Sequence, residues 1–257
     1  MKKIQHVYPV IGQQRVGGNF YRLTLKAPDL ARRVRPGQFI HIRVTDGLKP
    51  FFRRPFSVFR AKKNLEILYE VVGPGTKILS QKKKGDRLDV LGPLGNAFVL
   101  PDKKIKQVVM IAGGIGLAPF MILTDVLKKK RVEKILLFGA RSRPAVLPLK
   151  EFKANGCRVF VSTDDGSQGV KGRVSALYPK INPGSDTAMI YACGPKAMLA
   201  DVKRYARKHR LKAQASCEEV MACGLGACLG CVIQTTQGYK TVCHDGPVFD
   251  LDEIIFS

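Results

Sequence analysis

Apolar and polar residues alternate along several short stretches of the first hundred residues. The segments "NFYRLTLKAP" (19–28), "GQFIHIRV" (37–44) and "NLEILYEVV" (64–72) show this period of two, which is typical of β-strands with one buried face. Turn sequences rich in Gly and Pro, among them "VRPGQ", "VGPG" and "LGPLGN", separate them. Many short strands at this spacing predict a small antiparallel β-barrel over residues 1–101.

The pattern changes after residue 101. The apolar stretch "KQVVMIAGG" (106–114) runs into a glycine turn, and "LAPFMILTDVLKKKR" (117–131) follows with apolar residues at helical spacing. More apolar strands come next, and the amphipathic segment "KAMLADVKRYARKHR" (196–210) closes the region. Strands that alternate with helices predict a Rossmann-like α/β domain with a parallel sheet over residues 102–213. Residues 214–257 remain as a small C-terminal domain.

Length and composition describe a globular chain. Of its 257 residues 45% are hydrophobic, which is enough for one or two domains with a real core. The N-terminal residues lack the continuous apolar segment of a signal peptide. The longest uncharged run, residues 108–123, is shorter than the ~20 apolar residues that a membrane-spanning helix needs. We therefore expect a cytoplasmic protein that does not enter a membrane.

The chain is strongly basic. It carries 44 Lys and Arg against 20 Asp and Glu, a formal net charge of +24. Such a balance raises the possibility of nucleic-acid binding, but the basic residues are scattered, are not interleaved with stacking aromatic residues, and no tryptophan is present. We expect a solvated basic surface that attracts anionic cofactors or an acidic partner, and no nucleic acid.

Cysteines provide the most specific chemical signal. Five of the seven lie in the last 41 residues, whereas a secreted protein of this size spreads its disulfides through the chain. Cys223 and Cys228 are separated by four residues, Cys228 and Cys231 by two, and Cys243 follows eleven residues later. This is the plant-type ligand order for a 2Fe–2S cluster.

Two other interpretations of the cysteine loop compete with the cluster. A zinc site usually has two close cysteine pairs and needs no special backbone, and a disulfide staple is the third option. The intervening "GLGA" and "LG" favour the cluster, because glycine lets backbone N–H groups approach bridging sulfides closely. Cys217 is best explained as a spare thiol, and His244 as a local hydrogen-bonding residue.

The barrel region contains residues suited to a flavin. In "RRPFSV" (53–58), Arg54 could hold a pyrophosphate, Phe56 could pack on an aromatic ring, and Ser57 could bond a ring nitrogen. Any barrel can carry an Arg and a Ser that flank a buried Phe, so this segment alone is weak evidence for a flavin site. The turn "GPGT" (73–76) adds a free hydroxyl and exposed amides suited to phosphate.

The α/β region contains a second candidate site, where strands end in glycine turns. In "IAGGIGLAP", Gly113, Gly114 and Gly116 lie between a strand and a helix, which suits a pyrophosphate, although simple packing is an equal alternative. A later strand ends in "YACGP", where Cys193, Gly194 and Pro195 could flank a nicotinamide, with core packing the alternative for the cysteine. In "STDDGS", Asp164 or Asp165 could bind ribose hydroxyls.

Taken in order, "RPFS", "GPGT", "GPLGNAF", "GGIGLAP" and "CGP" resemble the ferredoxin-reductase superfamily, in which a flavin barrel precedes a nicotinamide domain. The tail "MACGLGACLGCVI…VCHDGPVF" is similar to electron-transfer subunits of NAD-linked dihydroorotate dehydrogenase (class 1B). The resemblance covers essentially the whole chain. It implies an FAD-binding domain (1–101), an NAD-binding domain (102–213) and a 2Fe–2S domain (214–257). It departs from the superfamily at Phe56, where tyrosine is common.

The resemblance also implies the residues that contact each cofactor. The implied contacts are Arg54, Pro55, Phe56, Ser57, Leu68, Tyr69, Glu70, Gly75 and Thr76 for FAD; Gly113, Gly114, Gly116, Cys193, Gly194 and Pro195 for NAD(H); and Cys223, Cys228, Cys231 and Cys243 for the cluster. No catalytic side chain is expected, because the cofactors carry the chemistry.

The function implied is electron transfer. The chain would pass electrons between NAD(H) and an FMN-containing dihydroorotate dehydrogenase catalytic subunit, through FAD and a 2Fe–2S cluster, in a heterotetramer of two of each. That oxidoreductase complex forms orotate in pyrimidine biosynthesis, and this chain alone should not oxidise dihydroorotate. Alternatives are electron-transfer subunits of cytosolic hydrogenases (sulfhydrogenases) or ferredoxin–NADP transhydrogenases and, from another class, a basic zinc- or nucleic-acid-binding module. Arg141 and Arg143 could accept a 2′-phosphate, so the expected preference for NAD over NADP rests on the resemblance alone.

Overall fold

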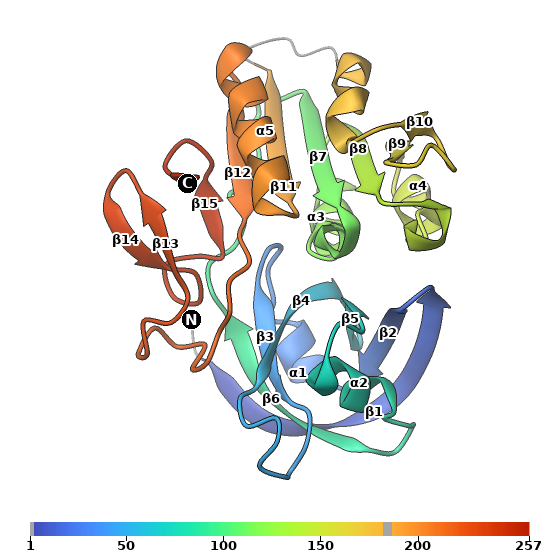
Figure 1. The fold of residues 1–257 in the computed structure, drawn as a ribbon, viewed down its shortest axis with the longest axis vertical. Coiled ribbons are helices and arrows are strands. Elements are labelled where there is room, and N and C mark those ends of the chain that lie inside the picture. Colours follow the sequence, from blue (N-terminus) through green and yellow to red (C-terminus); the bar gives the residue numbers. More distant parts are fainter. Residues whose placement is uncertain (1–2, 182–186, 257) are drawn as a thin grey trace.

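Six antiparallel strands close the N-terminal barrel in the order β1-β2-β5-β4-β3-β6 (Figure 1). The computed structural model describes residues 3–181 and 187–256. Alternate side chains, such as Ile40 and Ile42 of β3, fill the barrel interior, as the period of two predicts. The predicted barrel is confirmed. Its elements are β1 (Ile4–Gly17), β2 (Phe20–Leu25), α1 (Pro28–Ala31), β3 (Phe39–Arg43), β4 (Arg54–Ala61), β5 (Leu65–Glu70), α2 (Pro74–Ser80) and β6 (Arg87–Leu94).

The second half of the chain builds a seven-stranded sheet in the order β10-β9-β8-β7-β11-β12-β15. All neighbours pair in parallel except β12 and β15, so the predicted parallel sheet is confirmed. The strand order reverses at β7, which has β8 on one side and β11 on the other. Its strands are β7 (Gln107–Gly113), β8 (Glu133–Ala140), β9 (Cys157–Thr163), β10 (Val170–Lys171), β11 (Ala188–Cys193), β12 (Lys212–Ser216) and β15 (Val248–Asp250).

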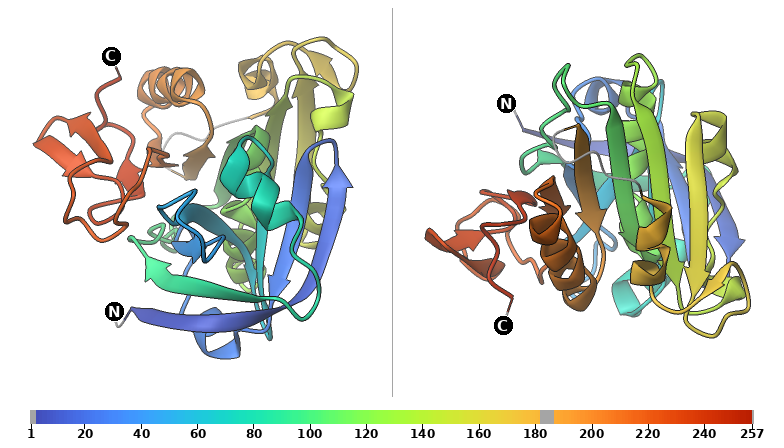
Figure 2. Two further views of the ribbon diagram at one scale, coloured as in Figure 1. Left: turned by 60° about the horizontal axis from the view of Figure 1, so that its bottom comes forward. Right: turned by 90° about the horizontal axis from the view of Figure 1, so that it is seen from above.

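Helices cover both faces of this sheet, as Figures 1 and 2 show. One core contains Val109 and Ile111 of β7 with side chains of α5 and η3, and the other contains Val108 and Met110 with side chains of α3 and α4. Helix α3 also contacts barrel strand β4, so the second core joins sheet and barrel. The helices are η1 (Gly114–Leu117), α3 (Phe120–Leu127), η2 (Arg143–Ala145), α4 (Lys150–Ala154), η3 (Val174–Lys180) and α5 (Lys196–Lys208).

The cysteine-rich segment forms a lobe beside the barrel and the sheet (Figure 2). A loop leaves β12, leads into the hairpin of β13 (Val232–Thr235) and β14 (Gly238–Thr241), and returns to the sheet as β15. Ser216 of β12 pairs with Val248 of β15. Among the described helices, none combines the length and apolar character that crossing a membrane requires.

Asn96 fixes the lobe to the barrel. Its side-chain amide donates to the carbonyl oxygens of Asp245 and Val248, each at 2.8 Å, and its Oδ1 accepts the N–H of Val248 at 2.9 Å. Its own N–H donates to the carbonyl of Gly246 at 2.6 Å. The sequence "GPLGNAF" therefore does more than turn the chain at the end of the barrel, because one side chain satisfies three backbone groups of the lobe.

We predict that Asn96→Ala lowers the free energy of unfolding by about 1–3 kcal/mol, because backbone groups of the lobe lose their partners. The measurement is the urea unfolding midpoint, followed by circular dichroism. Asn96→Asp keeps the acceptor for the Val248 N–H but sets a carboxylate oxygen against the carbonyl oxygens of Asp245 and Val248, so its midpoint should be no higher than that of Asn96→Ala. An unchanged midpoint for Asn96→Ala would contradict the role of this contact.

Candidate functional site

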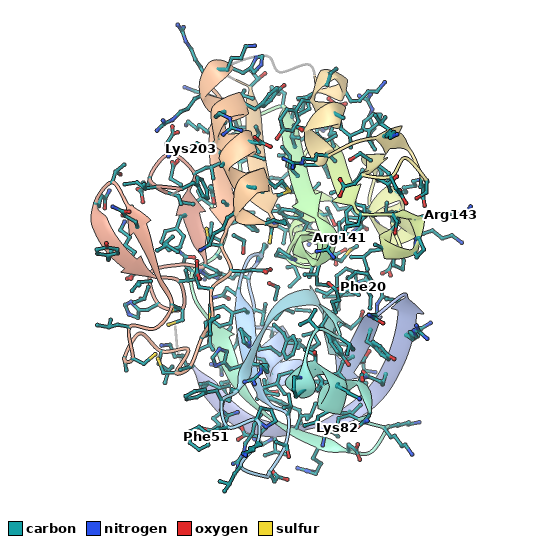
Figure 3. The ribbon with its side chains drawn as sticks, in the orientation of Figure 1. Phe20, Phe51, Lys82, Arg141, Arg143 and Lys203 are labelled. Atoms are coloured by element: carbon teal, nitrogen blue, oxygen red, sulfur yellow. The ribbon has the colours of Figure 1, made fainter. Side chains whose placement is uncertain are left out.

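A cavity of about 810 Å³ opens between the barrel and the carboxyl edge of the sheet. Phe20 and Glu70 line it from the barrel, and the loops that follow β7, β8, β9 and β11 line it from the sheet. In Figure 3 the labelled Phe20, from the barrel, lies just below Arg141, from the sheet, and both line the cavity. Its volume is within the range of small-molecule sites, and it lies where the strand order reverses, which is the usual ligand position in open α/β sheets.

The glycine turn after β7 forms the floor of the cavity. A Cβ on Gly113 would lie 2.9 Å from the Pro195 side chain, and one on Gly116 would collide with the carbonyl of Cys193. These two glycines are therefore needed for packing, as one of the two sequence interpretations had it. Gly114, at φ +54°, has open space beside it, and all three line the cavity. The close packing brings the ends of β7 and β11 together.

The segment after β11 lines the cavity only in part. Gly194 and Pro195 contribute to its wall, but the Cys193 side chain is fully buried in the sheet core and is not part of the lining. Burial raises the pKa of the Cys193 thiol well above its ordinary value. The structure thus places Cys193 beneath the candidate nicotinamide site, in keeping with the core-packing alternative.

Arg141 and Arg173 line the cavity together with Asp164. Neither forms an ion pair with a carboxylate within 4.0 Å among the residues described. Unpaired guanidinium groups at a strand-end cavity suit the phosphates of a dinucleotide. Arg143 lies at the outer edge of the sheet (Figure 3) and does not line the cavity, and Asp165 is engaged with Ser167. Arg173 was missed by the sequence analysis, since no motif surrounds it.

Arg54 lies against the first turn of α2. A Cβ on Gly75 would be 2.9 Å from Nε of Arg54, so only glycine lets this guanidinium lie so close to the helix backbone. Nη1 donates to the carbonyl of Phe52 at 2.7 Å, and no carboxylate pairs with Arg54 in the described part of the chain. The arrangement leaves its remaining N–H groups for an anionic ligand, which fits the pyrophosphate role implied for Arg54 and Gly75.

Thr76 does not offer the free hydroxyl that the sequence suggested. Its Oγ1 accepts the N–H groups of Val72 at 2.9 Å and Gly73 at 3.1 Å, and it donates to the carbonyl of Gly73 at 3.1 Å. The hydroxyl therefore stabilises the start of α2, because the first N–H groups of a helix have no intrahelical partner. This corrects the expectation for the hydroxyl.

The remaining residues implied for FAD divide between two faces of the barrel wall. Phe56 is only 8% exposed and contacts the ring of Tyr69 with centroids 5.6 Å apart, so most of its ring is already packed. Leu68 and Tyr69 are buried, whereas Glu70 lines the cavity. Pro55 and Ser57 alternate with Phe56 along β4 and are half-buried on its opposite face.

The four cysteines of the loop approach one another in two pairs. The thiol of Cys223 lies within hydrogen-bonding reach of Cys228, and that of Cys243 within reach of Cys231. A 2Fe–2S cluster has two irons and four cysteine ligands, so two pairs suit it. In the described residues no three Cys, His, Asp or Glu side chains are grouped around one point for a single metal ion. The donor set fits the cluster.

Backbone N–H groups point at these sulfur atoms, as the glycine-rich spacing predicts. Leu225 donates to Sγ of Cys223 at 3.4 Å and Gly226 to Sγ of Cys243 at 3.1 Å. Burial raises the pKa of Cys223, but the hydrogen bonds from backbone N–H groups outweigh it and lower that pKa to about 6. Burial, together with the neighbouring Cys231, raises the pKa of Cys243 to about 12.

Two other residues of this region remain outside the cluster. Cys217 is buried and lines the cavity, where burial raises its pKa to about 12, so it is separate from the four paired thiols. The Nδ1 of His244 lies 3.0 Å from Oδ1 of Asp245, which fits the local hydrogen-bonding role expected of it.

The cysteine loop lies directly on the barrel. Gly224, at φ +68°, approaches β3 so closely that a Cβ there would lie 2.5 Å from Cε1 of His41. Phe39 of β3 shares a buried apolar core with Cys231 and Cys243. The candidate cluster site and the candidate flavin strand β4 are thus both in contact with one strand, β3.

Comparisons with known proteins agree with this arrangement. Residues 218–255 match the family model described as the iron-sulfur cluster binding domain of dihydroorotate dehydrogenase B, and residues 110–204 match an oxidoreductase NAD-binding domain. The chain is 38% identical over 254 residues to the dihydroorotate dehydrogenase B (NAD(+)) electron transfer subunit of Desulforamulus reducens, covering 96% of this chain and 97% of that protein. The corresponding Bacillus cereus subunit is also 38% identical, over 256 residues and 96% of each chain.

Solved structures share the fold. An NADH-dependent reduced ferredoxin-NADP oxidoreductase superposes with a TM-score of 0.86 at 28% identity, over 97% of this chain and 90% of that one. A ferredoxin NADP+ reductase from Neisseria gonorrhoeae gives a TM-score of 0.67 at 20% identity, over 80% of this chain and 91% of that one. The second likeness concerns the fold alone.

We predict that Arg173→Ala weakens NADH binding about tenfold, because a hydrogen bond to a charged group contributes about 1.5 kcal/mol or more. Titration of NADH fluorescence gives the Kd. Arg143→Ala is the control, since that side chain lies outside the cavity, and its Kd should equal that of the unchanged protein. Equal affinities for all three proteins would show that Arg173 does not contact the dinucleotide.

Proposed function

The chain belongs to the family of dihydroorotate dehydrogenase B electron transfer subunits, and we propose that it carries electrons between NAD(H) and an FMN-containing catalytic subunit that interconverts dihydroorotate and orotate. It is an oxidoreductase subunit, with a barrel, a nicotinamide-type sheet and an iron–sulfur lobe. Bound FAD would exchange a hydride with the nicotinamide and single electrons with a 2Fe–2S cluster. The observation that best supports the proposal is that the four cysteines of the loop approach one another in two pairs and that this loop lies directly on the barrel.

Each group of residues has a distinct part in this proposal. Arg54 beside Gly75 would hold the flavin pyrophosphate, while Arg141 and Arg173 would hold the dinucleotide phosphates over the turn at Gly114. The four paired cysteines would ligate the cluster, and the backbone N–H groups around them would set its reduction potential. The protein contributes position and electrostatics.

The partner and the assembly belong to the same proposal. Large apolar side chains are exposed on the loop between β3 and β4, where Leu48 is 80% and Phe51 74% exposed, and on the cysteine loop, where Val220 is 86% exposed. Exposed apolar residues close to a redox centre suit the docking of a partner protein. We propose that the catalytic subunit binds there, in a heterotetramer of two of each chain.

Domain limits and location are also proposals. We divide the chain at 1–101, 102–213 and 214–257, a division supported by the barrel ending at β6 and the sheet beginning at β7. The return of β15 to the sheet makes the third unit a lobe attached to the second. We propose the cytoplasm as the location, since cluster-ligating thiols persist in a reducing compartment.

A second candidate function is a subunit of a ferredoxin–NADP transhydrogenase. One observation favours it: two unpaired guanidinium groups, Arg141 and Arg173, line the dinucleotide cavity and could hold an additional phosphate. Titration with NADPH beside NADH separates the two, because tighter binding of NADPH would favour the second candidate.

Protein prepared anaerobically should contain FAD and about two irons and two acid-labile sulfides per chain. Cys228→Ser should lose most of the iron and sulfide, because one iron loses a thiolate ligand, and should keep FAD. Cys217→Ala is the matched control and should retain the full cluster. Metal and sulfide analysis with the visible spectrum gives the result, and a colourless protein that holds zinc would refute the proposal.

Docking of the partner is tested by replacing one exposed apolar side chain. Phe51→Asp should abolish co-purification with the catalytic subunit, since a buried unpaired charge opposes association, and should leave reduction of ferricyanide by NADH unchanged. Val170→Asp, on the distant edge strand β10, is the control that should still co-purify. Mass measurement by light scattering reports whether the complex has two copies of each chain.

A further inference from the structure

His41 is a buried polar side chain whose ring nitrogens have no hydrogen-bond partner among residues 3–181 and 187–256. It lies on β3 with none of its surface exposed. Two ring nitrogens without partners in a protein interior are costly, so such a group usually marks a missing ligand or a functional constraint. His41 is not among the residues that the sequence analysis assigned to a site.

The surroundings of His41 show what covers it. Alternation along β3 puts Ile40 and Ile42 inside the barrel and His41, with Phe39, on the outer face. On that face Gly224 of the cysteine loop is the close neighbour: a Cβ there would lie 2.5 Å from Cε1 and 2.7 Å from Nδ1 of the ring. The loop beside Cys223 thus covers a polar ring.

The same strand connects this ring to the candidate flavin strand. His41 is the register partner of Pro55, and Phe39 is the register partner of Ser57. Partners in an antiparallel ladder share a face, so His41 and Ser57 lie on one side of the β3–β4 pair as diagonal neighbours. The imidazole therefore lies between the strand that would carry the flavin and the loop that would carry the cluster.

We propose that His41 is a positioning residue for the cluster, and that its ring N–H donates a hydrogen bond to a sulfur atom of the bound 2Fe–2S group. This inference rests on the proposed function. The cluster is favoured over the flavin as the acceptor because Gly224 of the cysteine loop lies directly against the ring, which has no exposed surface, whereas Ser57, on the flavin strand, is half-buried. Burial, with Arg53 and Arg54 nearby, lowers the pKa of His41 to about 4, so the neutral ring carries one N–H.

Such a bond stabilises the reduced cluster, which carries the more negative charge on its sulfur atoms, and so raises the reduction potential. His41→Phe retains a ring of similar shape and removes the donor. We expect its reduction equilibrium to shift about tenfold toward the oxidised form, equivalent to about 59 mV for one electron. His41→Gln restores an N–H and should recover part of the shift.

The experiment is an EPR-monitored redox titration of the whole chain, loaded with its cofactors. Phe39→Leu is the matched control, because it disturbs the same barrel–loop contact without removing a hydrogen-bond donor, and its potential should not change. Iron, sulfide and FAD are measured in each sample first. Absence of sulfide in the unchanged protein would refute the proposed function, whereas a full cluster with equal potentials in His41→Phe and the unchanged protein would overturn the inference alone.

A second measurement needs no change at His41. The chain has four histidines, and His244 is the other one beside the cysteines. In protein labelled with ¹⁵N-histidine and carrying His244→Gln, pulsed EPR of the reduced cluster should detect a coupled imidazole nitrogen. No histidine coupling in that sample would overturn the inference, even if His41→Phe failed to hold its cluster.

Discussion

The contact between the cysteine loop and barrel strand β3 is the constraint on which the rest of the structure depends. Electrons pass between redox centres only over short distances, so a loop that holds a cluster must lie against the wall that holds a flavin. Gly224 permits the approach because no Cβ stands between the loop and His41, and Asn96 fixes the lobe through three backbone groups. Without these contacts the lobe would remain attached to the sheet through β15, but it would not be held against the barrel wall.

The sequence was sufficient to predict much of the fold, since the signals were local. Alternation along β2, β3 and β5 predicted the barrel, and the change to helical spacing after β7 predicted the parallel sheet. The cysteine spacing and its glycines also predicted backbone N–H groups close to the sulfur atoms, which the structure shows at Cys223 and Cys243. Each of these properties is encoded within a few neighbouring residues.

What the sequence could not reveal depends on distant contacts. Alternation assigns His41 to the outside of the barrel, but a loop some 180 positions later in the chain covers it. Cys193 lies beneath the cavity that its neighbours line, because β11 is buried within the sheet. Thr76 is a local exception: its hydroxyl is bonded to the backbone of Val72 and Gly73, four and three residues away, and is not free for phosphate. Arg173 joins Arg141 only because parallel strands end at one edge.

The pairing of Ser216 with Val248 has a consequence for how such proteins change over time. The cysteine loop and the β13–β14 hairpin leave and re-enter the sheet at one pair of the β12–β15 ladder, so their two ends are held at the spacing of adjacent strands. The conformational entropy lost when such a loop closes grows only slowly with its length, so a long insert is little less favourable than a short one. Segments that carry different redox centres could therefore be inserted between β12 and β15 while the barrel and the rest of the sheet keep their architecture.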